Sequence, residues 1–361
     1  MITDLTKEHP DKILWRFLLP LMISVIFQQF YNIADSMIAG KFAGESALGA
    51  VGASYPITII YMAFAVGMNL GASVVISRLF GAGDKAGLRR AVSTAFISVL
   101  VLSVLLSVFG YFCSGAMMRW IHTPEDIMAD GVLYLKIYVY GLSFLLFYNV
   151  CTGIFTALGD SKTPLYFLIG SSLGNIFLDY WFVAGLHWGV AGVVWATFIA
   201  QGIACVLALI TMVKRLRQIK TDKKAEYFSA DMLKRIAHIA IPSILQQSFV
   251  SIGNIFVQSG INLFGATATA GAGAYLKIEG FGFLPINAFV LALTTFVSQN
   301  LGAKEYGRAK EGARFGVISC MVMAEGVALL IYLLAPQLLS LFGGDPDMIA
   351  FGIRYARTVT P

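Results

Sequence analysis

The sequence predicts an all-α, polytopic membrane protein made of two six-helix bundles, related by a pseudo-two-fold axis along the membrane normal. Three observations predict this fold: a scarcity of charge, a series of long apolar segments, and an internal repeat. Of the 361 residues, 58% are hydrophobic and only 13% are charged, about half the charged fraction of an average soluble domain. We therefore do not expect a soluble protein.

Apolar segments of about 20 residues recur along the chain, separated by short charged loops. They lack the alternation of polar and apolar residues that marks a membrane β-strand, and a lipid-exposed backbone must then be helical. The predicted spans cover residues 13–40, 53–77, 92–114, 131–157, 164–184, 190–213, 236–264, 271–300 and 312–342. A tenth begins near residue 347 and the sequence ends inside it, so we expect the second bundle to be truncated in this chain.

The second half of the sequence repeats the first. The stretch "SRLFGAGDKAGLRRA" at 77–91 corresponds to "SQNLGAKEYGRAKEG" at 298–312, and "LLPLMISVIFQQF" corresponds to "AIPSILQQSFV". An even number of spans separates the copies, so both halves enter the membrane in the same sense, as in parallel repeats. The predicted divisions are an N-terminal bundle at 1–213, a basic cytoplasmic linker at 214–235 and an incomplete C-terminal bundle at 236–361.

Most of the 26 lysines and arginines lie in the N-terminal segment and in the loops that follow even-numbered spans. The opposite loops clearly hold only Lys41 and Arg119. Because basic loops stay in the cytoplasm, the N-terminus is predicted to be cytoplasmic. Anionic lipid headgroups account for the net charge of +6, so membrane lipids are expected partners and nucleic acid is not.

Two carboxylates stand within strongly apolar segments. Asp35 lies in "QQFYNIADSMIAG", and Asp179 follows Asn175 by four residues, which places both on one helix face. Counted along their spans at about 1.5 Å per residue, Asp35, Asp179 and Thr197 fall in the outer half of the membrane. Their oxygens suit Na⁺, and two close carboxylates suit a shared proton. The alternative is that each acid only hydrogen-bonds a neighbouring helix.

Other polar residues inside the spans are candidates for a substrate cavity. They are Gln28, Tyr31, Asn149, Gln246, Lys277 and Glu279. Buried amides more often bridge helices than bind a substrate. Glu279 and Lys277 are two residues apart, so they do not face each other on one helix. Each could equally pair with another helix or line the cavity. Glu325 is interpreted as structural.

No catalytic pattern is found in the sequence. The cysteines lie within or at the ends of apolar segments and the histidines share no ligand spacing: Cys113, Cys151, Cys205, Cys320, His9, His122, His187 and His238. The glycine-rich "GAGDKAG" lacks the order of a phosphate-binding loop. We therefore expect neither an enzyme nor a bound cofactor. The ion expected to bind the acidic residues, and to act as coupling ion in transport, is Na⁺ or H⁺.

The chain resembles the multidrug and toxic compound extrusion (MATE) family, in its prokaryotic branch of DNA-damage-inducible and related proteins. The motifs that carry the resemblance are "LPLMISVIFQQFYNIADSMIAGKFAG", "GAVGASYP", "SRLFGAGDKAGLRRAV" and "TALGDSKTPL". The resemblance implies a twelve-helix antiporter with a V-shaped cleft, in a prokaryotic inner membrane. It implies a cation site at Asp35, Asn175, Asp179 and Thr197, with Pro20 as a hinge in the first span.

The expected function is therefore cation-coupled export of amphipathic, often cationic, drug-like compounds by alternating access, carried out by a monomer. A sister branch has an acid in span seven, where this chain has only Asn254 and glutamines. The alternatives are a flippase for lipid-linked oligosaccharides, a membrane-embedded enzyme and a passive channel. A flippase would need a cationic cavity, where Lys277 stands nearly alone.

Overall fold

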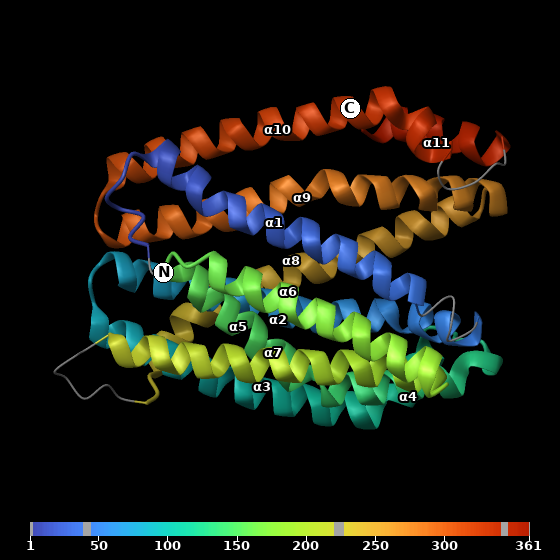
Figure 1. Cartoon of the computed structure of the whole chain (residues 1–361), viewed down its shortest axis with the longest axis horizontal. Helices are drawn as coiled ribbons and strands as arrows, with labels where there is room; N and C mark the ends of the chain where they lie inside the picture. The colour runs from blue at the N-terminus through green and yellow to red at the C-terminus, as the bar shows by residue number, and fades with distance from the viewer. Residues whose placement is uncertain (1–2, 39–44, 220–226, 341–345, 361) are drawn as a thin grey trace.

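The computed structural model describes residues 3–38, 45–219, 227–340 and 346–360, and the regular structure in these ranges is helical (Figure 1). The helices are α1 (Pro10–Ile38), α2 (Glu45–Gly81), α3 (Lys85–Trp120), α4 (Glu125–Tyr140), α5 (Leu142–Ala157), α6 (Lys162–Asp179), the π-helical η2 (Tyr180–Gly185), α7 (Gly189–Gln218), α8 (Ala230–Asn262), α9 (Ala266–Gly302), α10 (Tyr306–Ser340) and α11 (Pro346–Val359). The predicted all-α membrane fold is confirmed.

Eight of the described helices are long and apolar enough to cross a membrane, or nine spans when α4 and α5 are counted as one. The predicted span 131–157 is in fact this pair, bent by 47° at Gly141. A Cβ atom at Gly141 would lie 3.2 Å from the Phe198 ring of α7. The chain therefore turns where α7 passes close to its backbone.

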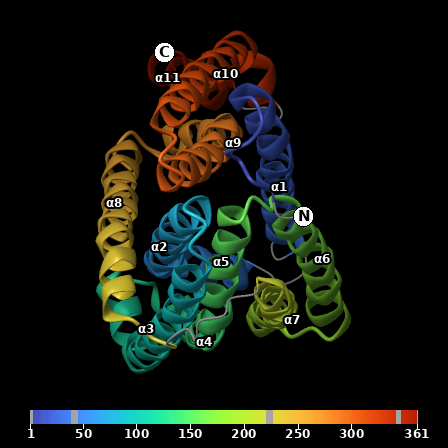
Figure 2. The same ribbon diagram turned by 90° about the vertical axis from the view of Figure 1, so that its left-hand side faces the viewer.

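The internal repeat is visible in the packing. Helix α1 packs on α9, and its repeat counterpart α8 packs on α2, on opposite sides of the molecule (Figure 2). Where α2 and α9 cross, a Cβ atom on Gly81 would clash with the Gln299 carbonyl. A Cβ atom on Gly302 would clash with the Arg78 carbonyl in the same way. These pairs are related by the repeat offset, so the contact is reciprocal, as two-fold symmetry requires.

The crossing of α2 and α9 lies at the end of the molecule where α2, α5, α7 and α9 finish (Figure 1). We call this the basic end, because Arg78, Lys85, Lys304 and Arg308 lie at these helix ends and turns. Helix α8 packs tightly on α2 near this end, where a Cβ atom on Gly71 would lie 2.7 Å from the Ile236 carbonyl. Later along α8 most of the described side chains are exposed or half-buried. The halves are thus held together most closely at the basic end.

The predicted linker at 214–235 is helical at both of its ends, where α7 runs on to Gln218 and α8 begins at Ala230. The Ser229 side chain caps α8 by accepting from the Met232 N–H group at 3.4 Å. Residues 220–226 lie outside the described residues. The division of the chain into two bundles with these boundaries stays a prediction.

Gly302→Val is expected to lower the melting temperature in detergent, because the added carbons have no space against the Arg78 backbone. Overpacking of this kind costs about 1–3 kcal/mol. The matched control is Gly253→Val on α8, where a Cβ atom meets nothing within 4 Å. Equal melting temperatures for the two variants would contradict the close crossing.

Candidate functional site

Helix α6 brings an amide and a carboxylate into the protein interior. Asn175 and Asp179 lie one turn apart on one face, and their exposed fractions are only 2% and 1%. The α-helix ends at Asp179 and continues as the π-helical turn η2. Such π-helical turns are frequent at functional sites. The acid therefore stands where the regular backbone hydrogen-bond pattern changes.

The Asn175 amide joins three helices. With its nitrogen facing Asp179, it donates to Asp179 Oδ2 at 2.8 Å and to the Tyr31 hydroxyl of α1 at 2.7 Å, while its oxygen accepts from the Thr197 N–H group of α7 at 3.1 Å. In the opposite orientation the Tyr31 hydroxyl donates to Asn175 Oδ1 at 2.7 Å. The first orientation satisfies more partners, because it avoids placing the amide oxygen against the carboxylate.

The sequence predicts the Thr197 hydroxyl at this cluster. Thr197 does reach Asn175, but through its backbone N–H group, while its hydroxyl donates to the Val193 carbonyl at 3.1 Å. Asp35 follows Tyr31 by four residues on α1, and this spacing places them on one helix face. The Asp35 side chain lies outside the described residues. The structure thus brings Asn175, Asp179 and the Thr197 backbone together, and their role as a cation site stays a prediction.

The sequence analysis assigns Tyr31 to the substrate cavity and does not predict the contact that the structure shows, in which its hydroxyl bonds the Asn175 amide. Its position one turn before Asp35 is the signal that could have found it. We call Tyr31, Asn175, Asp179 and Thr197 the oxygen cluster. In this cluster the Asp179 carboxylate and the Tyr31 hydroxyl supply hard oxygen donors of the kind that Na⁺ or a proton takes. Among the described residues, no three His, Cys, Asp or Glu side chains gather into a metal site.

The other predicted cavity residues are spread over α1, α5, α8 and α9. Gln28, Gln246 and Lys277 are exposed. Asn149 donates to the Leu145 carbonyl of its own helix at 2.9 Å. Pro20, the predicted hinge, is buried within α1, and the Ser24 hydroxyl donates to its carbonyl at 2.9 Å.

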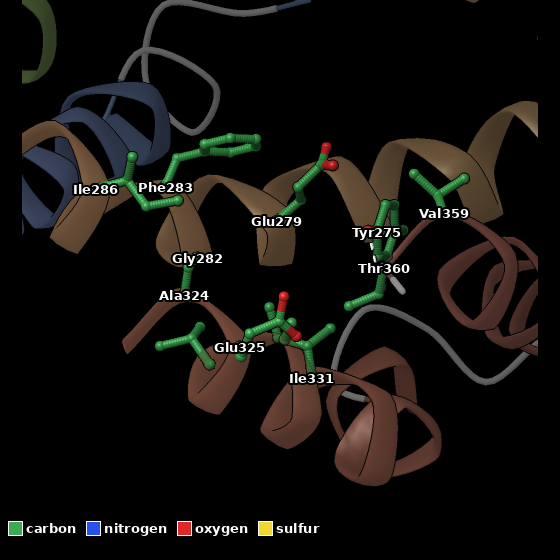
Figure 3. A pocket seen from close by; sticks show the side chains of 12 residues that line it. Tyr275, Glu279, Gly282, Phe283, Ile286, Ala324, Glu325, Ile331, Val359 and Thr360 are labelled. Atoms are coloured by element: carbon green, nitrogen blue, oxygen red, sulfur yellow. Dashed lines mark hydrogen bonds between the residues drawn. The ribbon is translucent and has the colours of Figure 1, made fainter. Parts of the chain in front are cut away.

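Glu279 lines a cavity of about 230 Å³ between α9, α10 and the end of α11 (Figure 3). Glu325, interpreted from the sequence as structural, lies on the wall of the same cavity. Tyr275 also lines it, and its hydroxyl lies 3.0 Å from the Thr360 hydroxyl. Glu279 and Glu325 therefore share a cavity that is separate from the oxygen cluster of the first half.

Comparison with known proteins identifies the family to which this chain belongs. The MatE family model matches residues 20–181 and 242–361. The chain is similar to the probable multidrug resistance proteins YoeA and YpnP of Bacillus subtilis (strain 168). It is 28% identical to YoeA over 93% of this chain and 75% of that protein, and 29% identical to YpnP over 99% of this chain and 80% of that protein.

A solved structure gives the same result. An outward-facing multidrug resistance MATE family transporter of the MOP superfamily matches with a TM-score of 0.91 and 25% identity, over 99% of this chain and 80% of that one. The match extends over both repeats and over the helices that carry the oxygen cluster. The chain belongs to the MatE family of membrane transporters, which are not enzymes.

Proposed function

We propose that this transporter exports amphipathic, often cationic, organic compounds in exchange for inward movement of Na⁺ or H⁺. The oxygen cluster is the observation that carries the proposal, since a buried carboxylate inside a membrane protein is expensive and marks an ion or proton path. Several relatives are described as multidrug resistance or multidrug export proteins. The acid with its amide partner provides the ion-binding half of such an exchange.

The cluster contains a polar switch. While Asp179 is ionised, the Asn175 N–H group donates to it and to Tyr31. When Asp179 takes up a proton, or its carboxylate binds Na⁺, that N–H group loses its charged acceptor. The Asn175 amide must then change its hydrogen bonds, and the bond that it makes with Tyr31 passes this change to α1. Ion binding on α6 is thereby transmitted to α1.

Helix α1 is suited to respond to this switch. Pro20 has no N–H group, so it removes one backbone hydrogen bond and weakens the helix at that turn. Tyr31 and Asp35 lie beyond it on the same helix. We propose that α1 changes its bend at Pro20 when the cluster takes up an ion. An ion that binds one shape better than the other then couples its gradient to transport.

The orientation of the protein in the membrane is proposed from the position of the basic end. Helix ends rich in lysine and arginine stay in the cytoplasm, so the basic end and the N-terminus are assigned to the cytoplasmic face of a prokaryotic plasma membrane. The protein is proposed to act as a monomer, with membrane lipids around its exposed apolar helices.

Transport by purified protein in liposomes tests the proposal. Ethidium, a fluorescent organic cation, is loaded on the cytoplasmic side, and a Na⁺ or pH gradient is imposed in separate experiments. Export that is accelerated by one gradient, and lost when an ionophore dissipates it, is expected. Ethidium movement that ignores both gradients would reject coupling, and scrambling of labelled lipid-linked sugar would favour a flippase.

Tyr31→Phe is expected to reduce gradient-driven export about two- to tenfold with little change in melting temperature. The ring remains, but one hydrogen bond of the Asn175 amide is lost, and such a bond contributes about 0.5–1.5 kcal/mol. Tyr166→Phe on the exposed side of α6 is the matched control. Equal export by both variants would remove Tyr31 from the switch.

A further inference from the structure

The segment before α1 lies between the two halves at the basic end. We call residues 3–8 the N-terminal strap. Leu5, in the middle of the strap, is completely buried with residues of α1 and α9. The Thr3 N–H group donates to the Leu158 carbonyl at the end of α5 at 3.3 Å. The strap is thus packed against the ends of helices from both halves, instead of lying free on the surface.

Gln299 of α9 connects the strap to the first half. Its Oε1 atom accepts from the Leu5 N–H group at 3.0 Å, and its Nε2 atom donates to the Ala157 carbonyl of α5 at 2.8 Å. The side chain is completely buried, so both bonds are shielded from water. Its own carbonyl is the atom that Gly81 of α2 approaches closely. One residue of the second half therefore touches the strap, α5 and α2.

Further bonds fix the strap on both sides. The Arg308 guanidinium of α10 donates to the Leu5 carbonyl at 3.2 Å and also to the Glu8 carbonyl. Gly159, at the end of α5, has a φ of +74°, and a Cβ atom there would clash with the Thr3 carbonyl. The strap itself is ordered locally, because Asp4 accepts from the Thr6 N–H group at 3.0 Å.

We propose that the strap and Gln299 form a latch that holds the basic end closed. The inference rests on the proposed function in one respect: alternating access requires this end to open. Opening would separate α9 from α5 and so break the bond from Gln299 to the Ala157 carbonyl and the bond from Thr3 to the Leu158 carbonyl. Because the bonds that opening breaks are made by a neutral amide and backbone groups, water can replace them once the end is open. The latch therefore stabilises the closed state, and breaking these bonds leaves no buried charge without a partner in the open state.

The test is the reactivity of a cysteine at Ser77, one turn before Gly81 on α2, which is completely buried. Ser77→Cys is made in a chain whose native cysteines are replaced, and labelling by a charged maleimide is followed in nanodiscs. Gln299→Leu leaves the Leu5 N–H group and the Ala157 carbonyl without their partner. Labelling is expected to accelerate about tenfold, because the closed state loses the shielded hydrogen bond that Gln299 makes between the two halves.

Two further variants make the result decisive. Gln218→Leu removes an exposed amide at the end of α7 and should label like the parent. Leu5→Ala keeps both Gln299 bonds but removes the buried strap side chain, so it should also accelerate labelling. If Gln299→Leu does not give a monodisperse protein, the labelling of Leu5→Ala serves as the test of the latch. Parent-like labelling of the folded variants would overturn the latch.

The labelling experiment needs neither a substrate nor an ion gradient. Faster labelling without any gradient-driven ethidium export would support the latch and reject the proposed coupling. Labelling at the rate of the parent, together with normal coupled export, would reject the latch and support the proposed coupling. The two proposals can therefore fail separately.

Discussion

Asp179→Asn is expected to abolish gradient-driven export and leave the fold intact. The substitution preserves shape and can still accept a bond from Asn175, which is 2.8 Å from Asp179 Oδ2. It removes the only charge that the described part of the oxygen cluster carries, so neither a proton nor Na⁺ can bind there as before. Export should fall at least about tenfold, to the level seen without a gradient, because coupling depends on the affinity of the ion for this site.

Asp126→Asn, at an exposed position in the first turn of α4, is the matched control for the loss of one carboxylate. Ethidium export is measured in liposomes with each imposed gradient, and the melting temperature is measured in detergent. The melting temperature of Asp179→Asn should equal or exceed that of the parent, since a buried charge is removed at little change in volume. Unchanged, gradient-dependent export by Asp179→Asn would refute its role as the coupling acid.

Spacing within one helix made part of the site predictable. Asn175 and Asp179 are four residues apart, so any helix there must place them on one face, and both are buried. The repeat offset likewise predicts equivalent places for Gly81 and Gly302, and they meet the partner helix reciprocally. In both cases the relevant information is contained in distances along the chain.

Contacts between helices could not be read in this way. Tyr31 reaches Asn175 across 144 positions of sequence, and Leu5 reaches Gln299 across 294. Nothing in the local pattern of either segment states which neighbour it meets. The bend at Gly141 and the π-helical turn after Asp179 depend on how α5, α6 and α7 pack together. Hydropathy registers a continuous apolar run in both places.

The substrate-cavity prediction was limited for the same reason. Gln246 and Lys277 are polar residues in apolar spans, and that property alone does not say which way they face. Glu279 and Glu325 line one cavity because α9 and α10 run side by side there, a relation that spacing along the chain does not contain.

Asp160→Ala is expected to lower the stability of the folded protein by about 2–4 kcal/mol, mainly by disrupting the basic end. Asp160 is 2% exposed, and its Oδ2 atom lies 3.2 Å from Arg215 Nη2 on α7. The same carboxylate accepts from the Thr163 N–H group at 3.1 Å and from its hydroxyl at 2.9 Å, and so caps the start of α6. Alanine removes the cap and leaves a largely buried guanidinium without its partner. Since Arg215 is 27% exposed, water recovers part of that loss.

The contributions of the cap and of the ion pair can be separated by three further variants. Asp160→Asn retains an oxygen for Thr163 but loses the charge, so its melting temperature should lie between those of the parent and of Asp160→Ala. Arg215→Ala leaves the carboxylate buried with its Thr163 bonds and should also destabilise. The double variant Asp160→Ala/Arg215→Ala should be less destabilised than the sum of the single changes, because the second change removes an already unpaired group. Strict additivity would show that the two side chains contribute independently, and the loss in Asp160→Ala would then belong to the cap of α6 alone.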